Sequence, residues 1–292
     1  MLRLFTDTDC DVTPELAEKH GYSGLISMPY SADGKTVYPY KEKDYVFDDG
    51  AYYDSLRGGL LPTTSAIPAE EYLTYFEPVF AAGDDILYVH FSKAMSATFS
   101  NLNQALATLQ ERYPERVCHL IDTRSATTCS LNIALAIGDL FLAGKTAEEI
   151  LAWAETEVDK YAMYLFADDL KFFHRSGRVG GLSAFMGSLL GVRPIIYMSP
   201  EGKMESCAKA RGKNNAMARL ISAMEEIGDD VTAHRVIIGH TGADPEVIEE
   251  LAAMIRERFG EDLPIMVQVV NPTLGAHAGP DGLAVSFHSK HR

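Results

Sequence analysis

Three short segments rich in hydroxyl side chains hold the residue types best suited to chemistry in this chain. They are Thr63-Thr64-Ser65, residues 92–98 with Ser96 near their end, and residues 275–280 with His277 at their centre. Hydroxyls, an imidazole and the free N–H groups at a helix start are donors suited to one cluster of anionic oxygens. None of the segments combines a nucleophile with a base and a group that orients the base. The pattern predicts a binding site for a carboxylate rather than a reaction centre, with no catalytic residue.

A second cluster of polar residues follows the first apolar run. Asp7, Asp9 and Asp11 alternate along the chain, and carboxylates at this spacing could bind a divalent metal, as in phosphatases whose first strand ends in an Asp-x-Asp motif. The match is imperfect, because the residues that fit an Asp-x-Asp-x-Thr pattern are Asp9, Asp11 and Thr13, and this pattern begins two residues after the strand ends. Asp11 to Thr13 are also explained as a turn and a helix cap. A metal-dependent, HAD-like phosphatase built on these carboxylates is kept as an alternative, and no metal site is expected.

Other motifs of catalysis or metal binding are missing from the sequence. There is no Gly-x-x-x-x-Gly-Lys-Ser/Thr loop, no Gly-x-Gly-x-x-Gly, no Gly-x-Ser-x-Gly and no His-Glu-x-x-His. The four cysteines form no Cys-x-x-Cys pair, so reduced thiols are expected. Basic clusters at residues 175–178 and 209–213 are either solvated surface charge or a docking point for an anionic group or an acidic partner.

Composition restricts the class of protein. A chain of 292 residues, 47% of them hydrophobic, is long enough for two domains. Its net charge of −15 opposes non-specific attraction to nucleic acid or anionic lipid. The longest apolar stretch contains Asp139 and is shorter than the roughly 20 residues that span a bilayer, and the N-terminus shows no signal-peptide pattern. We expect a cytoplasmic protein that binds a small molecule or a protein, without stable membrane insertion and without nucleic acid.

Alternating strands and helices must position these segments in the first half of the chain. Apolar runs at residues 2–6, 86–91 and 117–121 are each followed by a polar loop and a helical pattern, which predicts a parallel sheet with crossover helices. Helices are predicted from Thr13, whose hydroxyl precedes Pro14, and over residues 101–112 and 131–142. Asp33-Gly34 predicts a hairpin between residues 27–31 and 35–40, which should pack at an edge or on the second domain.

The second half follows a different pattern. Strands are predicted at residues 163–167, 193–198 and 236–239, with a turn at 200–203 that joins antiparallel strands, and helices at 214–227 and 245–259. The fold class predicted is α/β with two domains: an N-terminal three-layer parallel-sheet domain, residues 1–160, and a C-terminal mixed-sheet domain, residues 161–292. The ligand is expected in the cleft between them.

Seven landmarks, in this order, resemble the DegV family of bacterial fatty-acid-binding proteins, and the resemblance runs essentially end to end. Each landmark is weak alone, whereas seven in order are specific. They lie at residues 6–12 (Thr-Asp-Thr-Asp-Cys-Asp-Val), 62–65 (Pro-Thr-Thr-Ser), 92–98, 121–125 (Ile-Asp-Thr-Arg-Ser), 175–178 (Arg-Ser-Gly-Arg), 187–194 and 275–280.

The resemblance implies that the chain holds one long-chain fatty acid between its domains. Thr64, Ser65 and Ser96 would bond its carboxylate, with His277 near the head group. Arg211 matches an arginine that kinase-linked members use near the site of phosphoryl transfer. Such proteins are similar to acyl-carrying subunits that present a fatty acid to a separate fatty acid kinase. The chain would then be a lipid-binding protein and not an enzyme, with no cofactor besides the bound fatty acid.

An apolar tunnel for the tail is consistent with elementary energetics. Burying about 14 methylenes contributes on the order of 10 kcal/mol, at ~0.8 kcal/mol each, whereas an unpaired buried carboxylate costs several kcal/mol. About a third of ten candidate residues should line the tunnel: Phe80, Phe91, Phe99, Phe166, Phe172, Phe173, Phe185, Met186, Leu189 and Leu190. Three functions stay open: a fatty-acid carrier, the phosphatase, and a lipid-sensing regulatory protein.

Overall fold

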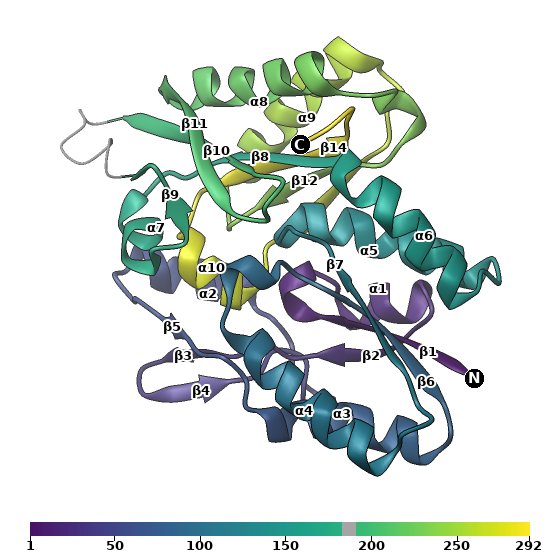
Figure 1. The fold of residues 1–292 in the computed structure, drawn as a ribbon. Coiled ribbons are helices and arrows are strands. Elements are labelled where there is room, and N and C mark those ends of the chain that lie inside the picture. Colours follow the sequence, from purple (N-terminus) through teal and green to yellow (C-terminus); the bar gives the residue numbers. More distant parts are fainter. Residues whose placement is uncertain (183–190) are drawn as a thin grey trace.

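The computed structural model describes residues 1–182 and 191–292, and its first sheet is wholly parallel (Figure 1). The strand order is β2-β1-β6-β7. The bounds are β1 Leu2–Asp7, β2 Tyr22–Ile26, β6 Asp85–His90 and β7 Cys118–Asp122. The three apolar runs predicted to form a parallel sheet are confirmed, and β2 joins them at the edge next to β1.

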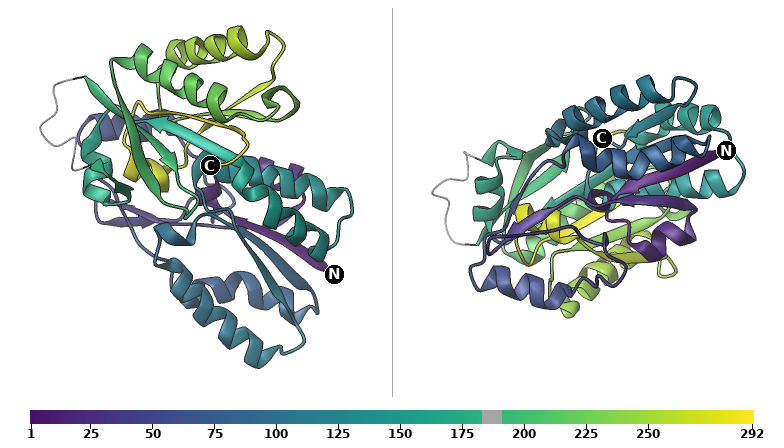
Figure 2. Two further views of the ribbon diagram at one scale, coloured as in Figure 1. Left: turned by 45° about the horizontal axis from the view of Figure 1, so that its top comes forward. Right: turned by 90° about the horizontal axis from the view of Figure 1, so that it is seen from below.

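Helices cover both faces of this sheet. Helices α3 (Ala69–Ala81) and α4 (Thr98–Arg112) lie on one face, while α1 (Pro14–Lys19), α5 (Thr127–Leu142) and α6 (Ala147–Glu157) lie on the other (Figures 1 and 2). The predicted cap of α1 is confirmed, because the Thr13 hydroxyl accepts a hydrogen bond from the Leu16 N–H at 3.3 Å.

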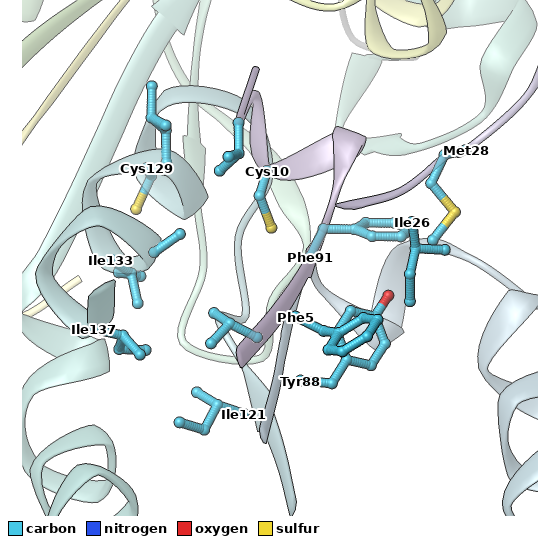
Figure 3. Packing of buried hydrophobic residues seen from close by; sticks show 14 of the residues in the cluster. Phe5, Cys10, Ile26, Met28, Tyr88, Phe91, Ile121, Cys129, Ile133 and Ile137 are labelled. Carbon is cyan, nitrogen blue, oxygen red and sulfur yellow. The ribbon is translucent and has the colours of Figure 1, made fainter. Parts of the chain in front are cut away.

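Side chains of the first sheet alternate between its two faces, as burial on both sides requires. Phe5 and Tyr88 point to one side (Figure 3), where both rings meet Phe76 of α3 at centroid distances of 5.6 and 5.7 Å. Ile121 of β7 lies on the other side, with Ile133 of α5 (Figure 3). Each face of the first sheet is therefore buried in an apolar interface of its own.

The second sheet is mixed and has the order β13-β12-β14-β8-β10-β11-β9. The predicted antiparallel pair is confirmed as β10 and β11, and β14, which the sequence analysis missed, lies antiparallel between β12 and β8. The bounds are β8 Tyr161–Phe166, β9 Val179–Gly180, β10 Val192–Met198, β11 Met204–Arg211, β12 Val236–His240, β13 Ile265–Val269 and β14 Leu283–His288.

Helix α5 lies between the two large sheets and packs on β1 on one side and on β8, β12 and β14 on the other. The outer face of the second sheet is covered by α8 (Lys213–Ile227) and α9 (Pro245–Phe259), both predicted from the sequence (Figures 1 and 2). Among the described residues no helix has the length and apolar character needed to cross a membrane.

A small third sheet lies beside the two large ones and has the order β4-β3-β5. The predicted hairpin is confirmed as β3 (Tyr30–Ala32) and β4 (Lys35–Val37), with φ of 50° at Asp33 and 75° at Gly34. It pairs with β5 (Thr63–Thr64) and not with the edge of a large sheet. The other α-helices of the described residues are α2 Asp49–Arg57, α7 Leu170–Ser176 and α10 Pro272–Ala278.

Candidate ligand-binding site

A cavity between the two large sheets encloses about 1100 Å³ of empty space, part of it open to solvent. From β1 the chain first runs to β2 on one side and later returns to β6 on the other, so the loops after β1 and β6 diverge. Such a switch point leaves a crevice at the carboxyl ends of the strands. Asp9, which follows β1, and Ser96, which follows β6, both line the cavity.

Most of the cavity wall is apolar. Three of the predicted tunnel residues, Phe91, Phe166 and Phe173, line it, together with other apolar side chains: Met28, Met95, Leu165, Met204, Val270, Leu274 and Leu283. Phe80, Phe99 and Phe172 do not line it. The other four candidates, Phe185, Met186, Leu189 and Leu190, lie outside the described residues.

Residues from three distant segments come together in this cavity: Thr64, Ser65, Ser96 and His277 all line it. The Thr64 hydroxyl lies 2.9 Å from Nε2 of His277, and Ser65 is exposed beside it. Ser96 Oγ accepts a hydrogen bond from the Thr98 N–H at 3.2 Å. Since the described part of the chain provides no acceptor for the Ser96 hydroxyl proton, that proton is available to a ligand.

The two serines of the 92–98 segment, Ser92 and Ser96, make different contacts. The Ser92 hydroxyl donates to the Gly202 carbonyl at 2.7 Å and is fully buried. Gly202 has φ of 76°, and a Cβ there would lie 2.3 Å from Ser92 Oγ. Ser92 therefore fixes the β10–β11 turn against the first sheet's loops, which leaves Ser96 as the serine that faces the cavity.

The start of α4 adds a backbone donor beside Ser96. Its N-cap residue, Ala97, provides no side-chain acceptor. Ser96 Oγ accepts from the Thr98 N–H and the Ala97 carbonyl from the Ser100 N–H, which leaves the Phe99 N–H of the first turn without such a partner among the described residues. Ala97 and Thr98 both line the cavity. A free N–H group and the positive end of the helix dipole favour an anion at this position.

His277 lies in a helix and not in the loop suggested by its glycine and proline neighbours. Asn271 caps α10 by accepting from the N–H groups of Thr273 and Leu274, and Pro272 occupies the first turn. The helix ends at Gly279, whose φ is 73°. His277 is thereby held in the last turn of α10.

Burial lowers the pKa of His277 to about 4, and the positive charges of Arg178 and Arg175 contribute to this shift. The imidazole is therefore neutral near pH 7. Of the two arginines, Arg178 lines the cavity. Arg175 donates instead to the carbonyls of Leu61 (3.1 Å) and Pro62, which anchors the segment that leads into β5.

Arg211 lies apart from the other predicted site residues. It ends β11, opposite Val192, whereas Met204 at the other end of the strand lines the cavity. At about 3.3 Å per residue the two are roughly 23 Å apart along the strand. A direct contact of Arg211 with a ligand in the cavity is therefore not expected.

The three alternating aspartates have three different environments. Asp7 accepts hydrogen bonds from the Tyr88 hydroxyl and from the N–H groups of Phe91 and Cys10. Asp11 accepts two from Asn271. Burial raises the pKa of both carboxyls to about 7.

Asp9 instead lines the cavity, and burial together with its two acidic neighbours raises its pKa. Asp7 and Asp11 are occupied as acceptors for the protein's own donors. Over residues 1–182 and 191–292, no group of three or more His, Cys, Asp or Glu side chains is arranged to hold a metal ion.

The sequence analysis missed several polar residues that line the cavity. They lie at the ends of strands or the starts of helices: Thr127, His240, Thr241 and Thr273. Arg178, which also lines the cavity, belongs to the basic cluster for which a docking point for an anionic group was one of two interpretations. His240 is the last residue of β12 and Thr241 follows it. Their place at a strand end that meets the crevice is the signal that could have identified them. Thr127 has φ of 49°, an unusual value for a β-branched residue, which no sequence pattern revealed.

Comparisons with known proteins agree over nearly the whole chain. A family model described as an uncharacterised protein of the DegV family matches residues 1–290. A DegV domain-containing protein of Clostridium perfringens is 31% identical over 237 residues, which is 81% of each chain.

Two solved structures have the same fold. One, described as fatty acid binding of a DegV family protein from Thermus thermophilus, has a TM-score of 0.82 at 23% identity and covers 99% of both chains. The other, a stearic-acid-binding protein from Eubacterium ventriosum, has a TM-score of 0.86 at 19% identity and the same coverage.

Proposed function

The chain belongs to the DegV family, and on that premise we propose that it binds one long-chain fatty acid. The carboxylate is bound by Thr64, Ser65 and Ser96, with His277 beside it, and the tail occupies the apolar part of the cavity. The observation that carries this proposal is that four hydrogen-bonding side chains from three distant segments line one otherwise largely apolar cavity.

The physical chemistry of a fatty acid matches the two parts of the cavity. Burial of about 14 methylenes supplies on the order of 10 kcal/mol before the costs of binding. The carboxylate would oppose this burial unless donors replaced its water. The free proton of Ser96 and the positive end of the α4 dipole, whose N-cap residue is Ala97, can replace that water. The two structures of the same fold described as fatty-acid-binding add support.

In this proposal the chain is a lipid-binding protein and not an enzyme. It presents its fatty acid to a separate fatty acid kinase, and Arg211 contacts that partner. The separation of Arg211 from the cavity suits a contact with a second protein better than a contact with the acid itself. The cytoplasmic location remains a prediction, which the four free thiols support.

The two alternative functions, a phosphatase and a lipid-sensing regulator, differ from a fatty-acid carrier in different ways. A phosphatase needs the carboxylates of Asp7, Asp9 and Asp11 for metal and substrate, but Asp7 and Asp11 accept hydrogen bonds from the protein itself. A lipid-sensing regulator would use the same cavity and differ from a carrier only in its partner. The contacts therefore favour a lipid-binding function over phosphatase chemistry.

Displacement of a fluorescent fatty acid tests the proposal. Palmitate should displace the probe at a stoichiometry of one per chain. Its methyl ester, which has the same tail but no charge, should bind at least about tenfold more weakly, because charge-assisted hydrogen bonds contribute roughly 1.5–3 kcal/mol each. No displacement by palmitate would refute fatty-acid binding, and equal affinity of acid and ester would refute the carboxylate site.

A further inference from the structure

We propose that the preferred ligand is a fatty acid with a hydroxyl group near the middle of its chain, and that Asp9 bonds this hydroxyl. The inference rests on the proposed function and narrows its ligand class. The observation behind it is that Asp9 lines the cavity and has no hydrogen-bond partner for its carboxyl group among the described residues.

Asp9 is 5% exposed and lines the cavity. Its Oδ1 is enclosed and has no hydrogen-bond partner, and the described residues provide no donor to the rest of the carboxyl group. Asp7, two residues earlier, receives three hydrogen bonds. Because buried polar groups in proteins are almost always paired, the missing partner of Asp9 is expected to come from the ligand.

Other polar groups without a partner in the described part of the chain line the same cavity as Asp9. The 3-10 turn η1 (Thr8–Cys10) packs on the start of α5, and α5 packs on β12. Thr127 of α5 and His240 of β12 line the same cavity. Nδ1 of His240 is buried without a partner, and no side chain caps α5. A hydrocarbon segment could not satisfy these groups, whereas a hydroxyl both donates and accepts a hydrogen bond.

Helix α10 sets the distance between this polar region and the proposed carboxylate site. At its start, Asn271 bonds Asp11, two residues beyond Asp9. Near its end, His277 bonds Thr64. Six residues at 1.5 Å per residue separate Asn271 from His277 by about 9 Å. A ligand whose carboxylate lies at Thr64 therefore passes Asp9 several carbons along its chain, and not at its head.

A competition assay with three acids of equal chain length tests the inference. The probes are stearate, 10-hydroxystearate and 2-hydroxystearate, each displacing the same fluorescent fatty acid. The wild-type protein should bind 10-hydroxystearate about tenfold more tightly than stearate, since a buried carboxyl group that has no partner in the described protein gains one hydrogen bond. The 2-hydroxy isomer should show no such gain, because its hydroxyl lies at the head group.

Two variants identify the residue responsible. Asp9→Leu, which replaces the carboxyl by an apolar side chain, should abolish the preference and bind stearate at least as tightly as the wild type. Asp9→Asn, nearly isosteric, should reduce the preference to a few-fold. Equal wild-type affinity for stearate and 10-hydroxystearate, or an unchanged preference in Asp9→Leu, would overturn the inference. If none of the acids displaced the probe, the proposed function itself would fail.

Discussion

Replacing Asp11 by Asn should raise the stability of the protein above pH 5 and leave it nearly unchanged at pH 4. Oδ1 of Asp11 accepts hydrogen bonds from the backbone N–H and the side-chain amide of Asn271, at 2.9 and 2.8 Å. An Asn oxygen would keep both. The other oxygen, Oδ2, is buried without a partner. Asp11 has φ of 53°, a conformation that Asn also adopts readily.

The magnitude follows from the change in pKa on folding. Burial raises the pKa of Asp11 from 3.8 to about 7. Between these values the native state binds more protons than the unfolded state, so the free energy of unfolding falls as pH rises. The loss begins near pH 4 and is complete above pH 7, where it amounts to about 2–4 kcal/mol. The Asn side chain does not ionise, so the variant avoids this loss.

Urea denaturation between pH 4 and pH 8 provides the assay. The difference in free energy of unfolding between variant and wild type should grow with pH in the direction of a more stable variant. A matched control is Asp33→Asn, an exposed residue that also has positive φ, at 50°, and the effect of Asp11→Asn is compared with the effect of this control at each pH. Parallel stability curves for Asp11→Asn and wild type would refute the assignment of a pH-dependent cost to Asp11.

Three further predictions concern the site. Ser96→Ala should weaken fatty-acid binding by about 1–3 kcal/mol, the usual result of removing one donor from a charged acceptor, whereas the exposed Ser100→Ala should not; equal effects would contradict the head-group assignment. A bound carboxylate should raise the pKa of His277 above its value of about 4, which a titration of its imidazole by NMR would detect and an unshifted titration would oppose. Arg211→Ala should spare fatty-acid binding but lower acyl-phosphate formation by a cognate kinase, and normal formation would count against its role as a partner contact.

Regular patterns in the sequence predicted three strands of the parallel sheet, whereas the start of α5 and the strand β14 were not predicted. The strands β1, β6 and β7 are short apolar runs followed by helices, and their parallel arrangement follows from that order. Helix α5 was predicted to start at residue 131 but starts at Thr127. It is buried against two sheets, so no amphipathic stripe marks where it begins. The strand β14 was missed, although four of its six residues are apolar and all six are buried.

The sequence predicted the chemical type of the candidate site, but not how its residues are arranged around the cavity. Hydroxyl-rich segments indicated an anion site, and the structure brings Thr64, Ser96 and His277 to one cavity. The sequence could not show that Arg175 anchors the segment before β5, because its partner carbonyls lie more than a hundred residues away. The alternating aspartates in the sequence also could not show that Asp9 faces the cavity while Asp7 and Asp11 do not, since this difference depends on the turn η1.

Native mass spectrometry of the purified protein, followed by solvent extraction, tests the central claim most directly. The account predicts one long-chain fatty acid per chain, released on extraction and identifiable by its mass, with an added oxygen if the hydroxylated ligand is the resident one. A protein that carries no fatty acid and instead retains a divalent metal would contradict the account and favour the phosphatase.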